Sequence, residues 1–113
     1  MNQETKARFE DRARVIKAMA HPTRLFIVDV LSEGEQCVQA LTEMVGADMS
    51  TVSRHLSVLR AAGIVQDDKR GSTVYYSLRM QCVLGFFECV DAVLSGGGEV
   101  CCTANGRVKK GRR

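Results

Sequence analysis

The hydrophobic pattern of this chain changes its period at Gly63, from helical to strand-like. Before that glycine, two short amphipathic segments, about residues 37–45 and 50–62, are joined by the turn Gly46-Ala47-Asp48. Asp48 is placed to cap the second helix, since its carboxylate can accept amide protons of the first turn. After Gly63, two β-prone runs, 64–67 and 73–78, flank a polar segment that contains a glycine. The sequence therefore predicts a helix-turn-helix followed at once by a β-hairpin.

Three further segments have the apolar spacing of amphipathic helices. They run from Glu4 to about Ala20, from Pro22 to about Ser32 and from about Met80 to Leu94. The resulting order is that of a winged helix-turn-helix, a mostly α fold of the α+β class in which the small β-hairpin is the wing. We expect one domain over residues 1–95. A Gly-rich linker, a pair of cysteines and a basic, disordered tail follow over 96–113.

The composition excludes several classes of protein. The net charge of +3 arises in the tail, because residues 1–104 hold eleven basic and thirteen acidic side chains. No apolar run approaches the roughly 18 residues of a membrane span, and the N-terminus has no signal-peptide pattern. Aromatic residues make up only 5%, which disfavours a surface for stacking single-stranded bases. We expect a cytoplasmic protein without a membrane partner.

Three stretches of the sequence carry a family resemblance. Residues 50–65, STVSRHLSVLRAAGIV, are the longest; residues 18–25 read AMAHPTRL and residues 69–76 read KRGSTVYY. In this order they resemble the recognition helix, the start of the second helix and the wing of the ArsR/SmtB family of metal- and metalloid-responsive repressors. The resemblance covers roughly residues 10–95. It implies a repressor, not an enzyme, that binds double-stranded operator DNA and releases it when a ligand binds.

The predicted recognition helix has two different faces. Val52, Leu56 and Leu59 fall together and should face the core. The other face carries short hydroxyl side chains around one arginine, which suits a major groove because Arg can make two hydrogen bonds to guanine. The DNA-contacting candidates of this helix are Ser50, Thr51, Ser53, Arg54, His55 and Ser57.

Three DNA candidates, one in this helix and two in the wing, need a further comment. His55 lies at the border of the buried face, so a structural histidine and a DNA contact are both open readings. In the wing, Lys69 and Arg70 are placed for contacts to phosphates or to the minor groove.

The apolar residues of the first and last predicted helices exceed what so small a domain can hide. They include Phe9, Ile16, Phe86, Phe87 and Val90. This surplus predicts a homodimer, and the family resemblance implies that these two helices pair. A two-fold dimer would place its recognition helices about 34 Å apart and read an inverted repeat.

The five cysteines are an odd number for a disulfide framework, so we expect free thiols or metal ligands. One arsenic site of the family that the chain resembles has the pattern Cys-Val-Cys. At the corresponding position this chain has Cys37-Val38-Gln39, so the second cysteine is missing. The family's zinc site in the last helix needs a histidine, and this chain has none after His55. Zinc sensing at that helix is therefore disfavoured.

The remaining thiols favour a soft, thiophilic ligand. We expect Cys101 and Cys102 to form the main ligand pair, with Cys82 as the third ligand and Cys37 as its alternative. The expected inducer is trivalent arsenic, inorganic or organic, with antimony as a further candidate, and no permanent cofactor. A redox-sensing repressor switched by cysteine oxidation is the alternative function. A thiol enzyme is disfavoured, because the chain has no Cys-x-x-Cys motif and no phosphate loop.

Overall fold

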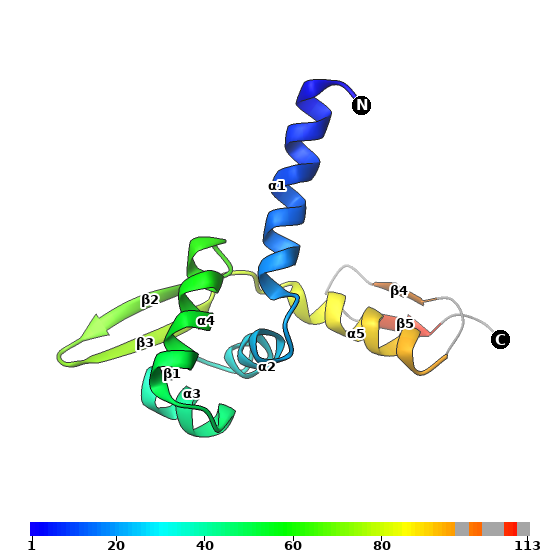
Figure 1. Ribbon diagram of the computed structural model, residues 1–113. Helices are drawn as coiled ribbons and strands as arrows, with labels where there is room; N and C mark the ends of the chain where they lie inside the picture. Colours follow the sequence, from blue (N-terminus) through cyan, green and yellow to red (C-terminus); the bar gives the residue numbers. More distant parts are fainter. Residues whose placement is uncertain (97–99, 103–107, 111–113) are drawn as a thin grey trace. The chain divides into compact units, whose positions relative to one another are not determined.

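Figure 1 presents the computed structural model of the chain. The structure describes residues 1–96, 100–102 and 108–110, the last two segments as backbone only. The chain divides into two compact units, Met1–Arg79 and Met80–Arg113, whereas the sequence predicted a boundary after residue 95. In the described part of the chain, no helix combines the length and the apolar character needed to cross a membrane.

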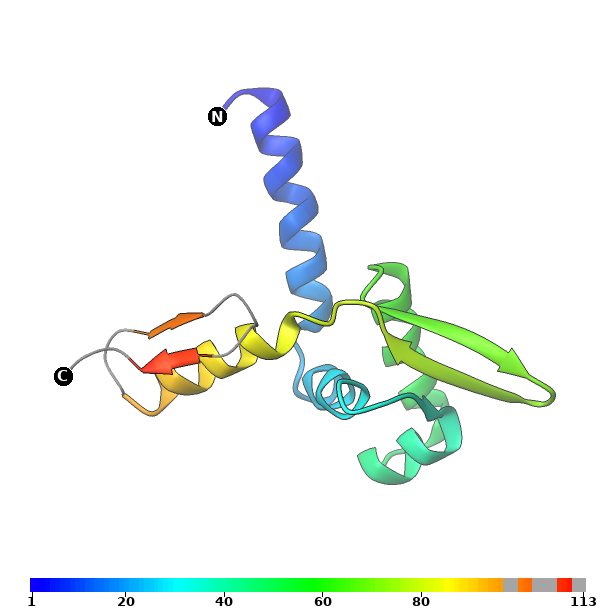
Figure 2. The same cartoon turned by 180° about the vertical axis from the view of Figure 1, so that it is seen from behind.

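The first unit begins with α1 (Gln3–Met19) and α2 (Pro22–Leu31). His21 caps α2: its Nδ1 accepts a hydrogen bond from the Thr23 amide at 3.1 Å, and Pro22 follows in the first turn, where no amide is needed. Only the end of α1 is buried, at Ala18 and Met19. The rest of α1 extends away from the other helices of this unit (Figures 1 and 2).

The predicted helix-turn-helix is present. It consists of α3 (Val38–Val45) and α4 (Met49–Ala61). Gly46 ends α3 with a φ of 79°, in the left-handed region that glycine adopts without a steric cost. Asp48 is the N-cap of α4, as the sequence predicted.

The wing belongs to a three-stranded antiparallel sheet with the order β1-β3-β2. Strands β2 (Val65–Arg70) and β3 (Thr73–Leu78) pair along their whole length and turn at residues 71–72, so the predicted loop over 68–72 is mostly strand. The hairpin projects beyond the helices of its unit (Figure 2). Strand β1 (Gln36–Cys37) pairs with β3 and was not predicted, because two residues show no hydrophobic period.

The core of the first unit lies where α2, α3, α4 and the base of the wing meet. Its fully buried side chains come from every one of these elements and are all aliphatic. They are Ile27, Val28, Leu41, Val52, Leu56, Leu59, Ile64 and Val65. Burial of each such side chain contributes roughly 1.5–3 kcal/mol, so this cluster fixes the position of α4 beneath the wing.

The second unit contains α5 (Val83–Leu94), β4 (Val100–Cys102) and β5 (Val108–Lys110). The helix begins three residues later than predicted, with Cys82 at its N-cap position. Strands β4 and β5 pair antiparallel, where the sequence predicted a disordered tail. Several large apolar side chains of α5 are exposed in the single chain; they are Leu84, Phe86, Val90, Val93 and Leu94.

Candidate nucleic-acid interface

Helix α4 is anchored by one face and presents the other to solvent. Val52, Leu56 and Leu59 have 0% exposed surface, as their spacing predicted. Around the outer face, Ser50, Arg54 and Ser57 are exposed and Thr51 and Ser53 are half-buried. The structure thus brings the predicted hydroxyl-rich face together on one side of α4, around the guanidinium group of Arg54.

The N-terminus of α4 is held by the Asp48 carboxylate. It accepts hydrogen bonds from the Thr51 amide and from the Ser50 hydroxyl, each at 3.2 Å. Hydrogen bonds from the side chain and amide of Thr51, and then from Ser50, lower the pKa of Asp48. The hydroxyls of Ser50 and Thr51 therefore have a partner in the free protein, and a DNA contact by either must compete with Asp48.

Two cations of this surface are available to an incoming phosphate. Arg54 of α4 and Lys69 of β2 are exposed, and neither side chain forms a hydrogen bond or ion pair within the described residues. An exposed cation without a protein partner exchanges only water and counterions for a phosphate oxygen. These two side chains are the strongest DNA candidates of the predicted set.

Arg70 is bound differently, in a way that sequence reasoning missed. Its guanidinium donates to both carboxylate oxygens of Glu35, at 2.6 and 3.0 Å, and to Asp68 at 2.9 Å. It also lies 4.5 Å from the ring centre of Tyr75. The bonds to Glu35 and then Asp68 raise the pKa of Arg70. Arg70 thus fastens the wing to the segment before α3, and two carboxylates offset the charge that was predicted to meet DNA.

His55 lies in a small cluster that joins α4 to α2. Its Nδ1 accepts a hydrogen bond from Nε of Arg24 at 3.1 Å, and its ring lies 4.5 Å from that of His21. Burial, followed by charge interactions with His21, Arg24 and Arg54, lowers the pKa of His55, so the neutral ring is favoured. This geometry supports the structural reading of His55. The contact between His21 and His55 was not predicted, because the two residues are far apart in the sequence.

The predicted thiolate ligands are described only in part. Cys37 is half-buried and caps α3, where its Sγ accepts from the Ala40 amide at 3.4 Å. Cys82 is exposed at the start of α5. Cys101 and Cys102 belong to β4, but their side chains lie outside the described residues. Among the described side chains, no three His, Cys, Asp or Glu residues gather as a metal site.

Comparisons with known proteins agree with this geometry. Residues 21–67 match the model of the bacterial regulatory protein family arsR. The chain is 43% identical over 75 residues to the nodulation protein NolR of Rhizobium meliloti. The aligned residues cover 66% of this chain and 62% of that protein. The chain belongs to the ArsR family. It is also 44% identical over 69 residues to a cadmium resistance transcriptional regulatory protein, a CadC homologue of Staphylococcus aureus, covering 60% of this chain and 57% of that protein.

Among solved structures, a homodimeric winged helix-turn-helix DNA-binding domain from Mycobacterium bovis superposes with a TM-score of 0.72. The two chains are 28% identical, and the match covers 88% of this chain and 95% of that domain. The predicted winged helix-turn-helix fold is thereby confirmed. The CadC homologue is named as a transcriptional regulatory protein and the Mycobacterium bovis domain as a possible ArsR-family transcriptional regulator, which supports the prediction that this ArsR-family chain is not an enzyme. The chain spans only 36% of one curated relative and 62% of NolR.

Proposed function

We propose that this ArsR-family chain is a DNA-binding transcriptional repressor that acts as a cytoplasmic homodimer. The observation that carries the proposal is the pair of faces on α4. Three fully buried side chains hold the helix, and the opposite side presents short hydroxyls around Arg54. Such a face fits the major groove of DNA, and Lys69 of the wing is available for a contact with the adjacent phosphate backbone of the DNA. The name of the CadC homologue, a transcriptional regulatory protein, points to the same activity.

Exposed apolar surface supports the homodimer. On α1, Phe9 and Ile16 are 46% and 53% exposed, and on α5, Phe86 and Leu94 are 47% and 78% exposed. Large apolar side chains exposed on two helices usually mark a contact with another chain. The related Mycobacterium bovis domain is homodimeric. We propose that α1 and α5 form the two-fold interface and that the dimer reads an inverted repeat.

DNA binding is tested by fluorescence anisotropy with a labelled inverted-repeat duplex from the region upstream of the gene. Arg54→Ala should lose about tenfold or more in affinity for this duplex, and less for a scrambled one, because a bidentate Arg–guanine contact discriminates by about 1–3 kcal/mol. Arg60→Ala is the matched control on the same helix, since Arg60 is paired with Asp67 at 3.0 Å. Equal losses for both variants on both duplexes would contradict base reading by Arg54.

The proposed inducer is a thiophilic metalloid, most simply trivalent arsenic as arsenite or an organoarsenical, with antimony as a related candidate. Cys101 and Cys102 supply the main pair of thiolates, and Cys82 or Cys37 supplies the third. The soft thiolate donors and the exposure of Cys82 support this proposal. So does the name of the CadC homologue, which concerns resistance to another thiophilic ion. Coordination would shift the dimer toward a form that binds DNA poorly.

The inducer is tested on the preformed protein–DNA complex under anaerobic, reducing conditions. Arsenite, a trivalent organoarsenical, cadmium and zinc are added separately, and release is followed by the loss of anisotropy. Cys101→Ser and Cys102→Ser should abolish release by arsenicals, whereas Cys89→Ser on α5 is the control. The weaker response of Cys82→Ser or of Cys37→Ser identifies the third ligand. Release only after admission of an oxidant, and never by a metalloid, would replace this input by cysteine oxidation.

A further inference from the structure

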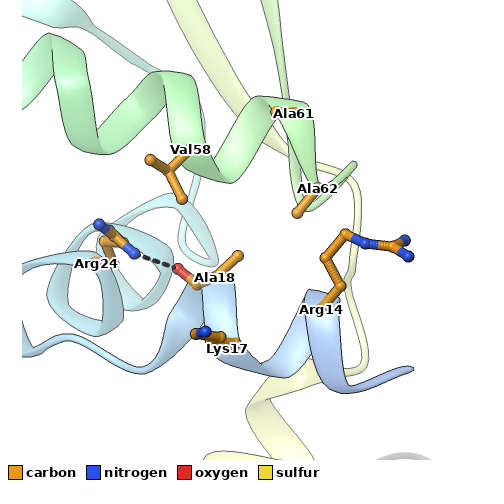
Figure 3. Close-up of a pocket in the computed structure, with 7 residues that line it drawn as sticks. All are labelled: Arg14, Lys17, Ala18, Arg24, Val58, Ala61 and Ala62. Atoms are coloured by element: carbon orange, nitrogen blue, oxygen red, sulfur yellow. Dashed lines mark hydrogen bonds between the residues drawn. The ribbon is translucent and has the colours of Figure 1, made fainter. Parts of the chain in front are cut away.

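A hollow of about 390 Å³ lies in the first unit between α1, α2 and α4. Figure 3 shows Val58 and Ala61 of α4, and Ala62 directly after it, on one side of the hollow, and Arg14, Lys17 and Ala18 of α1 on the other. Arg24 of α2 closes one side. The volume lies within the range of small-molecule sites in proteins. The hollow therefore has room for an organic ligand beside the C-terminal half of the recognition helix.

The lining of this hollow combines an apolar floor with a cationic rim. The floor consists of Val58 and three alanines, and the rim carries Arg14, Lys17 and Arg24, with no acidic residue in the lining. Arg14 is paired with Asp11 at 2.7 Å, outside the lining. Lys17 has no ion pair within the described residues. The surroundings therefore carry a net positive charge next to apolar surface, which complements a molecule with an anionic head and an apolar body.

The proposed dimer interface leaves this hollow open. Phe9 and Ile16 are seven residues apart on α1 and share one face of the helix. At about 100° per residue, Arg14 and Ala18 lie on the opposite face, whereas Lys17 lies at the flank, about 100° from Ile16. A partner chain that covers Phe9 and Ile16 can therefore leave Arg14 and Ala18 uncovered, with Lys17 at the edge of the interface.

We propose that this hollow binds a small amphipathic carboxylate, such as a medium-chain or aromatic organic acid. The apolar body lies on Val58, Ala61 and Ala62, and the carboxylate accepts hydrogen bonds from Lys17 at the rim. A DNA phosphate would gain nothing from the apolar floor, and an uncharged lipid would gain nothing from the rim. The chemistry of the site thus selects for both parts of the ligand at once.

The site is connected to the recognition helix through Arg24. The guanidinium donates from Nη1 to the Ala18 carbonyl of α1 at 3.3 Å and from Nε to Nδ1 of His55 on α4 at 3.1 Å. A carboxylate beside Arg24 offers it a charged acceptor, which is stronger than a neutral imidazole. Binding therefore weakens the Arg24–His55 bond and gives α4 a second input, besides the thiolates.

The test uses DNA-free protein, so its outcome does not depend on the proposed repressor activity. Decanoate is titrated into the ¹⁵N-labelled chain, and amide shifts are compared with those caused by decanol and by decyltrimethylammonium. We expect decanoate to shift the amides of Ala18, Ala61 and Ala62 first, and to bind more tightly than either probe of the same chain length. Equal binding of decanol and decanoate, or shifts centred on α5, would overturn the proposal.

Two variants sharpen this test. Lys17→Gln should weaken decanoate binding about two- to fivefold, the range of an exposed charge pair, without a change for decanol. Lys6→Gln on the same helix is the matched control and should have no effect. Ala61→Phe should fill the hollow and weaken binding of all apolar probes; circular dichroism checks that it folds. Unchanged decanoate affinity in Lys17→Gln and in folded Ala61→Phe would place the ligand elsewhere.

Discussion

Acidification from about pH 7.5 to about pH 5.5 should destabilise the first unit through His55. In the folded chain, Nδ1 of His55 accepts the hydrogen bond of Arg24, which requires that this nitrogen carry no proton. Burial, followed by charge interactions with His21, Arg24 and Arg54, lowers the pKa of His55 below its ordinary value of 6.5. Protonation would break the hydrogen bond that links α2 to α4 and place a positive charge beside the guanidinium groups of Arg24 and Arg54.

The direction and the limit of the effect follow from proton linkage. Below about pH 6.5 the unfolded chain binds a proton at His55 that the folded chain does not, so stability falls as the pH falls. The contribution of His55 to the free energy of unfolding is fully present above about pH 6.5. It is lost as the pH falls from there to the lower pKa of His55 in the folded chain. The loss is at most about 1.4 kcal/mol per pH unit, and the partial exposure of the ring makes it smaller.

The assay is urea unfolding followed by circular dichroism at about pH 7.5, 6.5 and 5.5, at one protein concentration because the stability of a dimer depends on concentration. His55→Asn is the comparison, since the amide oxygen of Asn can accept from Arg24 and does not titrate. The wild type should lose more free energy of unfolding than His55→Asn below pH 6.5. Equal losses in the two proteins would refute the role assigned to His55.

Three further predictions concern the same unit. Leu56→Ala removes a side chain with 0% exposure and should cost about 3 kcal/mol in urea unfolding; a loss below about 1 kcal/mol would mean that the core closes around the gap. Asp48→Ala should lower the thermal midpoint of unfolding because it removes the cap of α4, whereas Asp48→Asn keeps an accepting oxygen and should keep a midpoint close to that of the wild type. Equal midpoints for Asp48→Ala and the wild type would contradict the role of Asp48 as a cap. Arg70→Ala should speed amide hydrogen exchange in β1, because Glu35 loses both hydrogen bonds, whereas Arg60→Ala should not. Equal exchange rates in the two variants would show that Arg70 does not connect the wing to the segment before α3.

The sequence predicted those features whose cause is local. The break of period at Gly63, the turn Gly46-Ala47-Asp48 and the cap at Asp48 each depend on a few neighbouring residues. The spacing of Val52, Leu56 and Leu59 likewise identified the buried face of α4, and hence the face that carries Arg54. Helix order and the hairpin follow from these patterns, which is why the winged helix-turn-helix was predictable.

The tertiary structure decided which distant residues meet. Strand β1 has only two residues, and its pairing with β3 depends on the position of the whole hairpin. Glu35 precedes that strand and pairs with Arg70, 35 positions away. Arg70, which was predicted to contact DNA, therefore connects the wing to the segment before α3. In the same way, packing of α1, α2 and α4 brought His21 to His55 and formed the hollow around Lys17. A sequence pattern records the period of each element, whereas such pairings arise only from how the elements pack.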